Sequence, residues 1–503
     1  MQKTDALTTS AAPTFNLDRL LETDFTQVRP FVFLAIVFLL VRLPFVNYGY
    51  GTDPDAWRVA MTAHHLLETG DYFPSRLPGN PLHELIITVF IPGGWLAANL
   101  ATALSALVGV YLFAKILKHH QLPYAGLVTV GFAFTPLLYI NSISTMDYMW
   151  TLTFILGAYY SMVSGRTVWA GIFIGLAIGC RLQSVILLPA FAFYLWRAND
   201  WREVFPMGFA AGGVAAICFS SVLTVYGLDF LNYYDAKVGY QDVIRLLGKE
   251  ALGILGGLGV LAGAAISLPR LIRLPMDAWK DPFVGSWVVV IAIYFASFTR
   301  LPHEIAYLIP VFPFGFLIMA RYFTRLALCG TIAAIVFAGV LDITTESDAI
   351  GPSSFTTASI GRGLILSNAV TMDAQRDFSN EIMKADIPNH SVVMSGFIFP
   401  QLAERERGRL DAKILQRDYA AISMLSDRGE AVDEERDIRY VWLLTFETFE
   451  ALRSQGYNMY LVPDAAGGTA ALYDYRPTLL GASFLKLERQ SPSAGKGTAS
   501  TDR

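Results

Sequence analysis

The chain has 503 residues, of which 54% are hydrophobic and only 16% are charged. Soluble domains carry about 25% charged residues, so this composition excludes an ordinary soluble protein and predicts an integral membrane protein. The net charge of −4 gives no excess of positive charge, which argues against nucleic acid as a partner. The cysteines all lie in apolar runs, so we expect small apolar residues and no disulfide framework. They are Cys180, Cys218 and Cys329.

The N-terminal region, residues 1–29, is polar and precedes the first apolar run, which extends from about Pro30 to Tyr48. A cleavable signal peptide would place its apolar region nearer the start and end it at small residues. We therefore expect residues 1–29 to form a cytoplasmic segment and the apolar run to remain as a membrane helix.

Apolar runs long enough to cross a bilayer core of about 30 Å recur along the first two thirds of the chain. We expect about eleven such spans, within a membrane domain at residues 30–343. Their centres lie near residues 39, 106, 132, 156, 174, 189, 216, 260, 291, 312 and 334. Basic residues mark alternate loops as cytoplasmic by the positive-inside rule, which places the first loop and the C-terminal region on the extracytoplasmic side. These residues are Lys115, Lys118, Arg166, Arg197, Arg202, Arg270, Arg273, Lys280, Arg321 and Arg325.

Small residues recur every four positions in two of these runs. One run has Gly171, Gly175 and Gly179, and the other has Gly208 and Gly212. Such faces let membrane helices approach closely, so we expect both sets to mark helix packing.

The loop after the first span begins an amphipathic helix. Asp53 is placed to cap it, Pro54 suits its first position and Gly70 is placed to end it. We expect the helix to lie along the membrane surface with its apolar face down. A second interfacial helix is expected at about residues 82–91, because Pro92-Gly93-Gly94 follows a run too short to span.

The last part of the chain is more polar, and residues 344–489 are expected to form a small extracytoplasmic α/β domain. Two segments have the pattern of amphipathic helices, Gln375–Ala385 and Phe446–Ser454. Short buried strands are expected at Ser391–Met394, Ala420–Met424, Ile438–Leu444 and Met459–Val462. Residues 490–503 are rich in Ser, Gly, Thr and Ala and are expected to be a disordered tail.

Four motifs share the outer side of the predicted membrane domain. The first is Asp53-Pro54-Asp55 with the loop residues that follow it, and the second is Asp147 at the outer start of a span. The third runs from Gly171 to Arg181, with Pro189 after it. The fourth is Arg300-Leu-Pro-His-Glu-Ile-Ala-Tyr307, with Pro310 after it.

In their order and placement these motifs resemble the C-type glycosyltransferase superfamily, over about residues 30 to 320. Its members are polytopic enzymes that use polyprenyl-phosphate-linked sugars, and they include protein O-mannosyltransferases and lipid A aminoarabinose transferases. The first motif departs from the commonest form, Asp-Glu, because Pro54 separates two aspartates. Asp53 and Asp55 both remain candidates for the catalytic position, and we favour Asp53 for its place at the loop start.

The resemblance implies an inverting hexosyl- or pentosyltransferase that acts on a lipid, glycan or protein acceptor. A carboxylate near the acceptor hydroxyl would serve as general base, and we assign this role to Asp53. Asp55 would hold sugar or acceptor hydroxyls, bind a divalent cation together with Asp53, or only pair with Arg58 while Asp53 caps the helix. The donor phosphate needs cationic partners, for which the candidates are Arg181, Arg300 and His303.

Further candidates carry less specific signals. They are Asp147, Arg42, Arg58 and Glu84. An Asp at a helix start is common for dipole reasons, and Arg42 is expected to pair with an acidic group. The segment Tyr226–Glu250 joins aromatic and polar residues, which suits sugar stacking but more often marks the membrane interface.

Two other functional classes fit part of the pattern. A transporter or flippase for a lipid-linked substrate would place charged residues near mid-membrane, whereas here they lie in outer loops. A non-enzymatic scaffold would act through its outer domain alone. We expect a multi-pass protein of a bacterial inner membrane, with its active site outside the cytoplasm.

Overall fold

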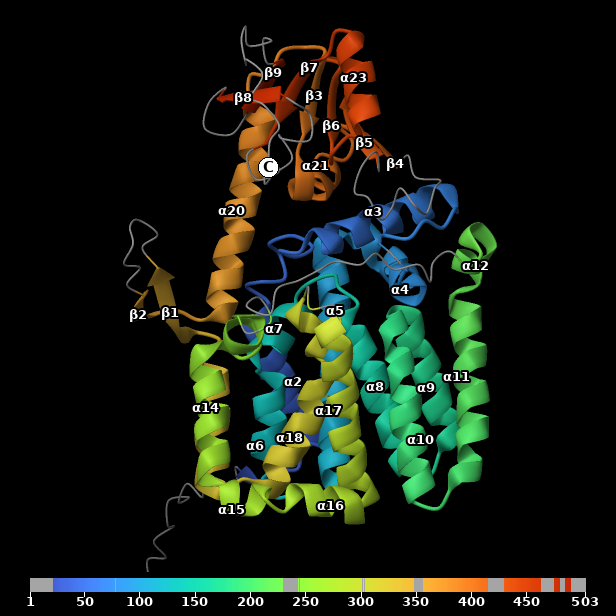
Figure 1. Cartoon of the computed structure of the whole chain (residues 1–503), viewed down its shortest axis with the longest axis vertical. Helices are drawn as coiled ribbons and strands as arrows, with labels where there is room; N and C mark the ends of the chain where they lie inside the picture. Colours follow the sequence, from blue (N-terminus) through green and yellow to red (C-terminus); the bar gives the residue numbers. More distant parts are fainter. Residues whose placement is uncertain are drawn as a thin grey trace, which may run out of the picture.

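The computed structural model describes residues 21–76, 78–228, 243, 245–300, 302, 304–347, 356–414, 429–462, 475–479 and 485–489. It consists of an apolar helix bundle and a smaller α/β domain at one end of the bundle (Figure 1). Some of the segments discussed above lie outside the described residues. They are the predicted strand at Ala420–Met424, the tail 490–503 and most of Tyr226–Glu250.

A helix lies at each of the expected centres in the membrane domain. The helices of the bundle are α2 (Val28–Arg42), α5 (Gly94–His119), α6 (Ala125–Ala133), α7 (Pro136–Ser142), α8 (Tyr148–Val163), α9 (Thr167–Cys180), α10 (Leu187–Arg197), α11 (Val204–Cys218), α12 (Ser220–Tyr226), α14 (Gly253–Ile266), α15 (Leu268–Leu271), α16 (Leu274–Lys280), α17 (Pro282–Arg300), α18 (Val311–Tyr322) and α19 (Arg325–Phe337). Helices α15 and α16, which carry Arg270 and Lys280, lie at the end of the bundle away from the α/β domain (Figure 1).

Many of these helices are short. Judged by length and composition alone, two helical runs in the described residues, Pro81–His119 and Pro282–Arg300, could cross a membrane, and up to four if each bent pair is one span. Helices α6 and α7 form one such pair, bent by 55° at Pro136, whose ring cannot continue the hydrogen-bond ladder. The number of spans therefore stays a prediction.

The helix predicted at residues 82–91 is present as α4 (Pro81–Phe90), which the 3₁₀ turn Ile91–Gly93 separates from α5. Gly94, at the junction, has φ 64° and ψ −162°, which is not a helical conformation, so the helix is broken there. The interfacial position of α4 stays a prediction.

The two sets of glycines differ. A Cβ at Gly175 would lie 2.8 Å from the carbonyl oxygen of Ala211 on α11, so the glycine face of α9 is packed against α11 as expected. The expectation was wrong for Gly208 and Gly212, because a Cβ at either would meet nothing within 4 Å. Those two glycines lie on an open face of α11.

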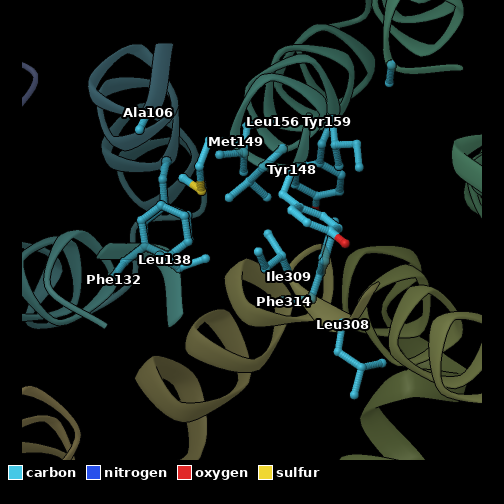
Figure 2. Close-up of a cluster of buried hydrophobic side chains, with 14 of the residues drawn as sticks. Ala106, Phe132, Leu138, Tyr148, Met149, Leu156, Tyr159, Leu308, Ile309 and Phe314 are labelled. Carbon is cyan, nitrogen blue, oxygen red and sulfur yellow. The ribbon is translucent and has the colours of Figure 1, made fainter. Parts of the chain in front are cut away.

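The core of the bundle is a continuous set of apolar side chains. Figure 2 shows Ala106 of α5, Met149 and Leu156 of α8 and Phe314 of α18 converging on its centre. Each of these side chains is at least 97% buried. The core supports the outer ends of α8 and α9, where the charged residues gather.

The α/β domain has a mixed sheet of seven strands in the order β4-β5-β6-β3-β7-β9-β8. Strand β3 lies parallel to β6 and β7, with Val393 opposite Tyr440 and Tyr460, and all other neighbours are antiparallel. The strands are β3 (Ser391–Met394), β4 (Asp411–Ile414), β5 (Gly429–Asp433), β6 (Ile438–Val441), β7 (Asn458–Leu461), β8 (Tyr475–Leu479) and β9 (Leu485–Arg489).

Three helices accompany this sheet, namely α20 (Leu364–Lys384), α21 (Phe399–Arg405) and α23 (Phe446–Ser454). Strand β3 and α23 have the predicted bounds, and the predicted helix at Gln375–Ala385 is the second half of α20. An antiparallel pair, β1 (Leu341–Ser347) and β2 (Thr356–Arg362), crosses the expected boundary at residue 343.

Helix α3 (Pro54–Thr69) lies between the bundle and the α/β domain (Figure 1). Ala56, Val59 and Ala60 join the core of the bundle, whereas Met61 joins the core of the α/β domain. The expectation that α3 lies open on the membrane surface is therefore incomplete, because its outer face is covered by α21.

Candidate active site

Asp53 forms the start of α3, as its position in the sequence predicted. Its Oδ1 accepts a hydrogen bond from the backbone N–H of Asp55 at 2.8 Å, and Gly70 ends the helix with φ 77°. Burial, together with the nearby carboxylates of Glu304 and Asp55, raises the pKa of Asp53 well above its usual range. Asp53 is therefore both a helix cap and a carboxyl group with a raised proton affinity.

Asp55 has a different environment. Its Oδ1 accepts a hydrogen bond from Arg58 at 2.9 Å, and its Oδ2 lies 3.4 Å from Arg76. Burial alone would raise the pKa of Asp55, but the charges of Arg76 and Arg58 hold it below its ordinary value. The two aspartates of the motif are thus held in different states, Asp55 ionised and Asp53 with a raised pKa.

Glu304 belongs to the same cluster although it lies about 250 residues away in sequence. Its carboxyl group and that of Asp53 are close enough to share a hydrogen bond, and its Oε2 accepts one from the Tyr148 hydroxyl at 3.1 Å. Burial, with the charge of Asp55, raises the pKa of Glu304. Two carboxyl groups in contact do not both ionise readily, so this pair favours a state that shares one proton.

Asp147 is fully buried between two arginines. Arg181 Nη1 lies 2.8 Å from its Oδ2, and Arg76 forms an ion pair with its Oδ1. The Arg181 guanidinium also lies 4.5 Å from the ring centres of both Tyr148 and Tyr307. Asp147 therefore orients two cations, of which Arg76 also faces Asp55, whereas Arg181 Nε has no hydrogen-bond partner within the described residues.

A small cavity lies beside Arg181. The centre of a water molecule has about 10 Å³ available in it, so the cavity holds about one water molecule. Among its lining residues, the buried atoms Arg181 Nε and Thr151 Oγ1 have no hydrogen-bond partner in the described part of the chain. Because buried polar atoms are rarely left unpaired, this wall is suited to a polar ligand or a bound water.

Two of the other sequence candidates have structural roles. Arg42 is 99% buried and donates hydrogen bonds to Ser142 Oγ and to the carbonyl oxygens of Phe38 and Ala133, so the expected acidic partner was wrong. Glu84 accepts hydrogen bonds from the Ser75 N–H at 2.9 Å and from the Tyr72 hydroxyl. Glu84 thereby fixes the loop that carries Arg76.

Arg300 is exposed at the end of α17, and His303 lies outside the described residues. The structure therefore brings five sequence-predicted residues together at one place. They are Asp53, Asp55, Arg58, Asp147 and Arg181.

Sequence reasoning missed Arg76 and missed Glu304 as a neighbour of Asp53. The only signal for Arg76 was a cation in a loop rich in Pro and Gly, between Pro74 and Pro81. Glu304 was part of the fourth motif, but only the tertiary structure brings it to α3. Within the described residues, no group of three or more His, Cys, Asp or Glu side chains is arranged to hold a metal ion. The oxygens of Asp55 already face Arg58 and Arg76.

Two solved structures share this fold over nearly the whole chain. One is ArnT from Cupriavidus metallidurans bound to undecaprenyl phosphate, with a TM-score of 0.55, 13% identity, and coverage of 93% of this chain and 99% of that chain. The other is ArnT from the same organism in the apo state, with a TM-score of 0.50, 12% identity, and coverage of 91% and 98%. No protein-family model and no curated protein matches the sequence. The resemblance to C-type glycosyltransferases that the sequence motifs indicated is thus confirmed for the fold.

Proposed function

We propose that this protein is a membrane glycosyltransferase that moves a sugar from a polyprenyl-phosphate donor to a hydroxyl group of a lipid, glycan or protein acceptor. The observation that carries the proposal is the meeting of a carboxyl pair, Asp53 and Glu304, with Arg76 and Arg181 at one end of an apolar bundle. The ArnT structure with undecaprenyl phosphate supports this class of donor. The site then lies on the extracytoplasmic side of a bacterial inner membrane.

In this proposal Asp53 is the general base. It takes the proton of the acceptor hydroxyl while the acceptor oxygen bonds to the anomeric carbon of the sugar, and Glu304 tunes the proton affinity of Asp53. The bond between the anomeric carbon and the phosphate oxygen breaks, and the electron pair leaves with the phosphate. Attack opposite the phosphate inverts the anomeric centre.

Arg76 and Arg181 receive the phosphate in this scheme. Both are held by Asp147, and Arg181 Nε, which has no hydrogen-bond partner within the described residues, is placed to form a charge-assisted hydrogen bond. The unpaired hydroxyl of Thr151 beside Arg181 offers a further donor to the polar head of the donor lipid. Asp55 is held in ion pairs and orients Arg58 and Arg76.

The test is release of free polyprenyl phosphate by the purified full-length protein. A panel of polyprenyl-phosphate sugars is supplied with crude envelope acceptors, and the variant Asp53→Asn is assayed in parallel. Release that depends on one sugar and is lost in the variant supports the proposal. No release with any donor contradicts it and favours a transporter of a lipid-linked substrate.

A further inference from the structure

The segment that leads into Asp53 is held from two directions. The carbonyl oxygens of Gly49, Tyr50 and Gly51 accept hydrogen bonds from groups of the membrane domain. The donors are Asn99 Nδ2 at 2.8 Å, the backbone N–H of Thr145 at 2.7 Å and Trp57 Nε1 at 2.8 Å. These bonds fix the segment on the bundle side up to residue 51.

Thr52, the residue immediately before Asp53, is held by the C-terminal part of the chain instead. Its carbonyl oxygen accepts a hydrogen bond from Gln375 Nε2 at 3.0 Å, and its hydroxyl donates one to Asn368 Oδ1 at 3.0 Å. Asn368 and Gln375 are seven residues apart on α20, which is two helical turns, so they lie on one face. The carbonyl oxygen and the hydroxyl group of Thr52 therefore both form hydrogen bonds with the same face of α20.

The rest of α3 is also held by the α/β domain. Met61 lies in the core formed by Ile382, Phe399 and other residues of that domain. Near the end of α3, Glu68 lies 2.7 Å from Arg407, which also pairs with Glu404. The α/β domain thus contacts the middle and the end of α3. Helix α20 holds Thr52, which precedes the capping residue Asp53.

We infer that Asn368 and Gln375 are positioning residues that set the place of Asp53 through Thr52, an inference that rests on the proposed function. Asp53 joins Thr52 through one peptide bond, and its side chain caps α3, so a shift of Thr52 moves the carboxyl group away from Glu304. A misplacement of about 1 Å in a catalytic group costs about 100-fold in rate. The α/β domain is therefore a part of the catalytic apparatus, and it acts by holding Thr52 in register with the bundle.

The test uses Gln375→Met and Asn368→Leu, singly and together, in the full-length protein. Both substitutions keep the size of the side chain and remove the hydrogen bond. The control is Thr371→Val, an exposed position on the same helix whose hydroxyl bonds only within α20. We expect kcat to fall at least about 10-fold in Gln375→Met with the KM for the donor nearly unchanged, because the phosphate site is left intact. A purely structural role would lower the yield of folded protein without changing kcat per folded molecule.

Hydrogen exchange over residues 50–58 gives a second readout that does not depend on catalysis. Faster exchange there in Gln375→Met, and not in Thr371→Val, supports the inference. If wild-type protein releases polyprenyl phosphate from no donor, the proposed function fails, and the exchange data alone decide the positioning role. A Gln375→Met variant with wild-type exchange, or with kcat within about twofold of wild type where turnover is measurable, overturns the inference.

Discussion

Arg181 and Asp147 form an ion pair of 2.8 Å that joins the outer end of α9 to the start of α8. Asp147 is fully buried, and Arg76 is its second partner. Burial of an unpaired carboxylate has a large free-energy cost. The two ion pairs of Asp147 therefore hold the loop of Arg76 and the end of α9 beside it. The same pairing gives the two arginines their orientation toward a ligand.

Loss of that carboxylate is expected to destabilise the protein. Asp147→Asn removes the carboxylate partner of Arg181 and one of the two carboxylates that pair with Arg76, and removal of one partner of a buried ion pair costs about 3–5 kcal/mol. The double variant Asp147→Asn/Arg181→Met is expected to lose less than the sum of the two single variants, because it removes both charges. Unfolding in detergent followed by circular dichroism measures all three. Strict additivity would show that the two side chains do not interact.

Asp53→Asn is expected to lower turnover by at least about 100-fold, the usual share of a general base. Asn caps helices as well as Asp does, so α3 and the overall stability are expected to be kept. Turnover per folded molecule, measured as release of polyprenyl phosphate, checks the prediction. Near-normal turnover of Asp53→Asn contradicts the role of Asp53.

The corresponding change at the neighbouring carboxylate, Asp55→Asn, is expected to lower turnover and also to raise KM, because Arg58 and Arg76 then lose the anion that they share.

The pH dependence of kcat is expected to report the contact between Asp53 and Glu304. A base acts only when ionised, and the pKa of Asp53 is raised above its ordinary 3.8, so activity falls as pH drops through that raised value. Glu304→Gln removes the like charge, which lowers the pKa of Asp53 and moves the acid limb to lower pH. An acid limb that does not move would show that Glu304 does not interact with Asp53.

The glycines of α9 and α11 offer a matched pair of substitutions. At Gly175 a Cβ would lie 2.6 Å from Val214 Cβ, so Gly175→Leu is expected to separate α9 from α11 and to cost about 1–3 kcal/mol or more. At Gly212 a Cβ meets nothing within 4 Å, so Gly212→Leu is expected to leave the melting temperature unchanged or raise it. Melting temperatures in one detergent compare the two. Equal effects would contradict the packing described for α9.

The α/β domain carries a pH-dependent contact on its surface. His390 Nδ1 lies 2.5 Å from Asp437 Oδ2, and this hydrogen bond raises the pKa of His390 above its ordinary 6.5. The pair thus stabilises the domain fully below pH 6.5, and its contribution is lost as pH rises through the raised value. Since His390 also lowers the pKa of Asp437 from 3.8, the contribution is lost again as pH falls below 3.8.

Protection of the β3 and β6 amides in the intact protein, taken as the exchange rate relative to the intrinsic rate at the same pH, is compared at pH 6 and pH 9. We expect weaker protection at pH 9. The control is His390→Asn, since His390 has φ 60° and Asn tolerates that conformation without strain. The same pH dependence in His390→Asn would show that another group is responsible.

The fold could be predicted from the sequence wherever residues close together in the chain determine the structure. The lengths of the apolar runs located the helices of the bundle, and the Asp-Pro start and Gly70 end gave α3 its bounds. Strand β3 and α23 followed from short patterns in the same way. The error at Gly208 and Gly212 has a physical cause, because helix packing depends on which neighbouring helix faces the glycines. The spacing of residues along one helix does not report that neighbour.

The same distinction between local and long-range interactions applies to the candidate site. Sequence by itself determined that Asp53, Asp55, Asp147 and Arg181 lie at the ends of helices, because helix caps are set by the residues beside them. Only the tertiary structure decided that Glu304 meets Asp53, that Arg76 meets Asp147 and that α20 holds Thr52. Those contacts join residues far apart in the chain, and they form only when burial of the apolar faces brings the helix ends together.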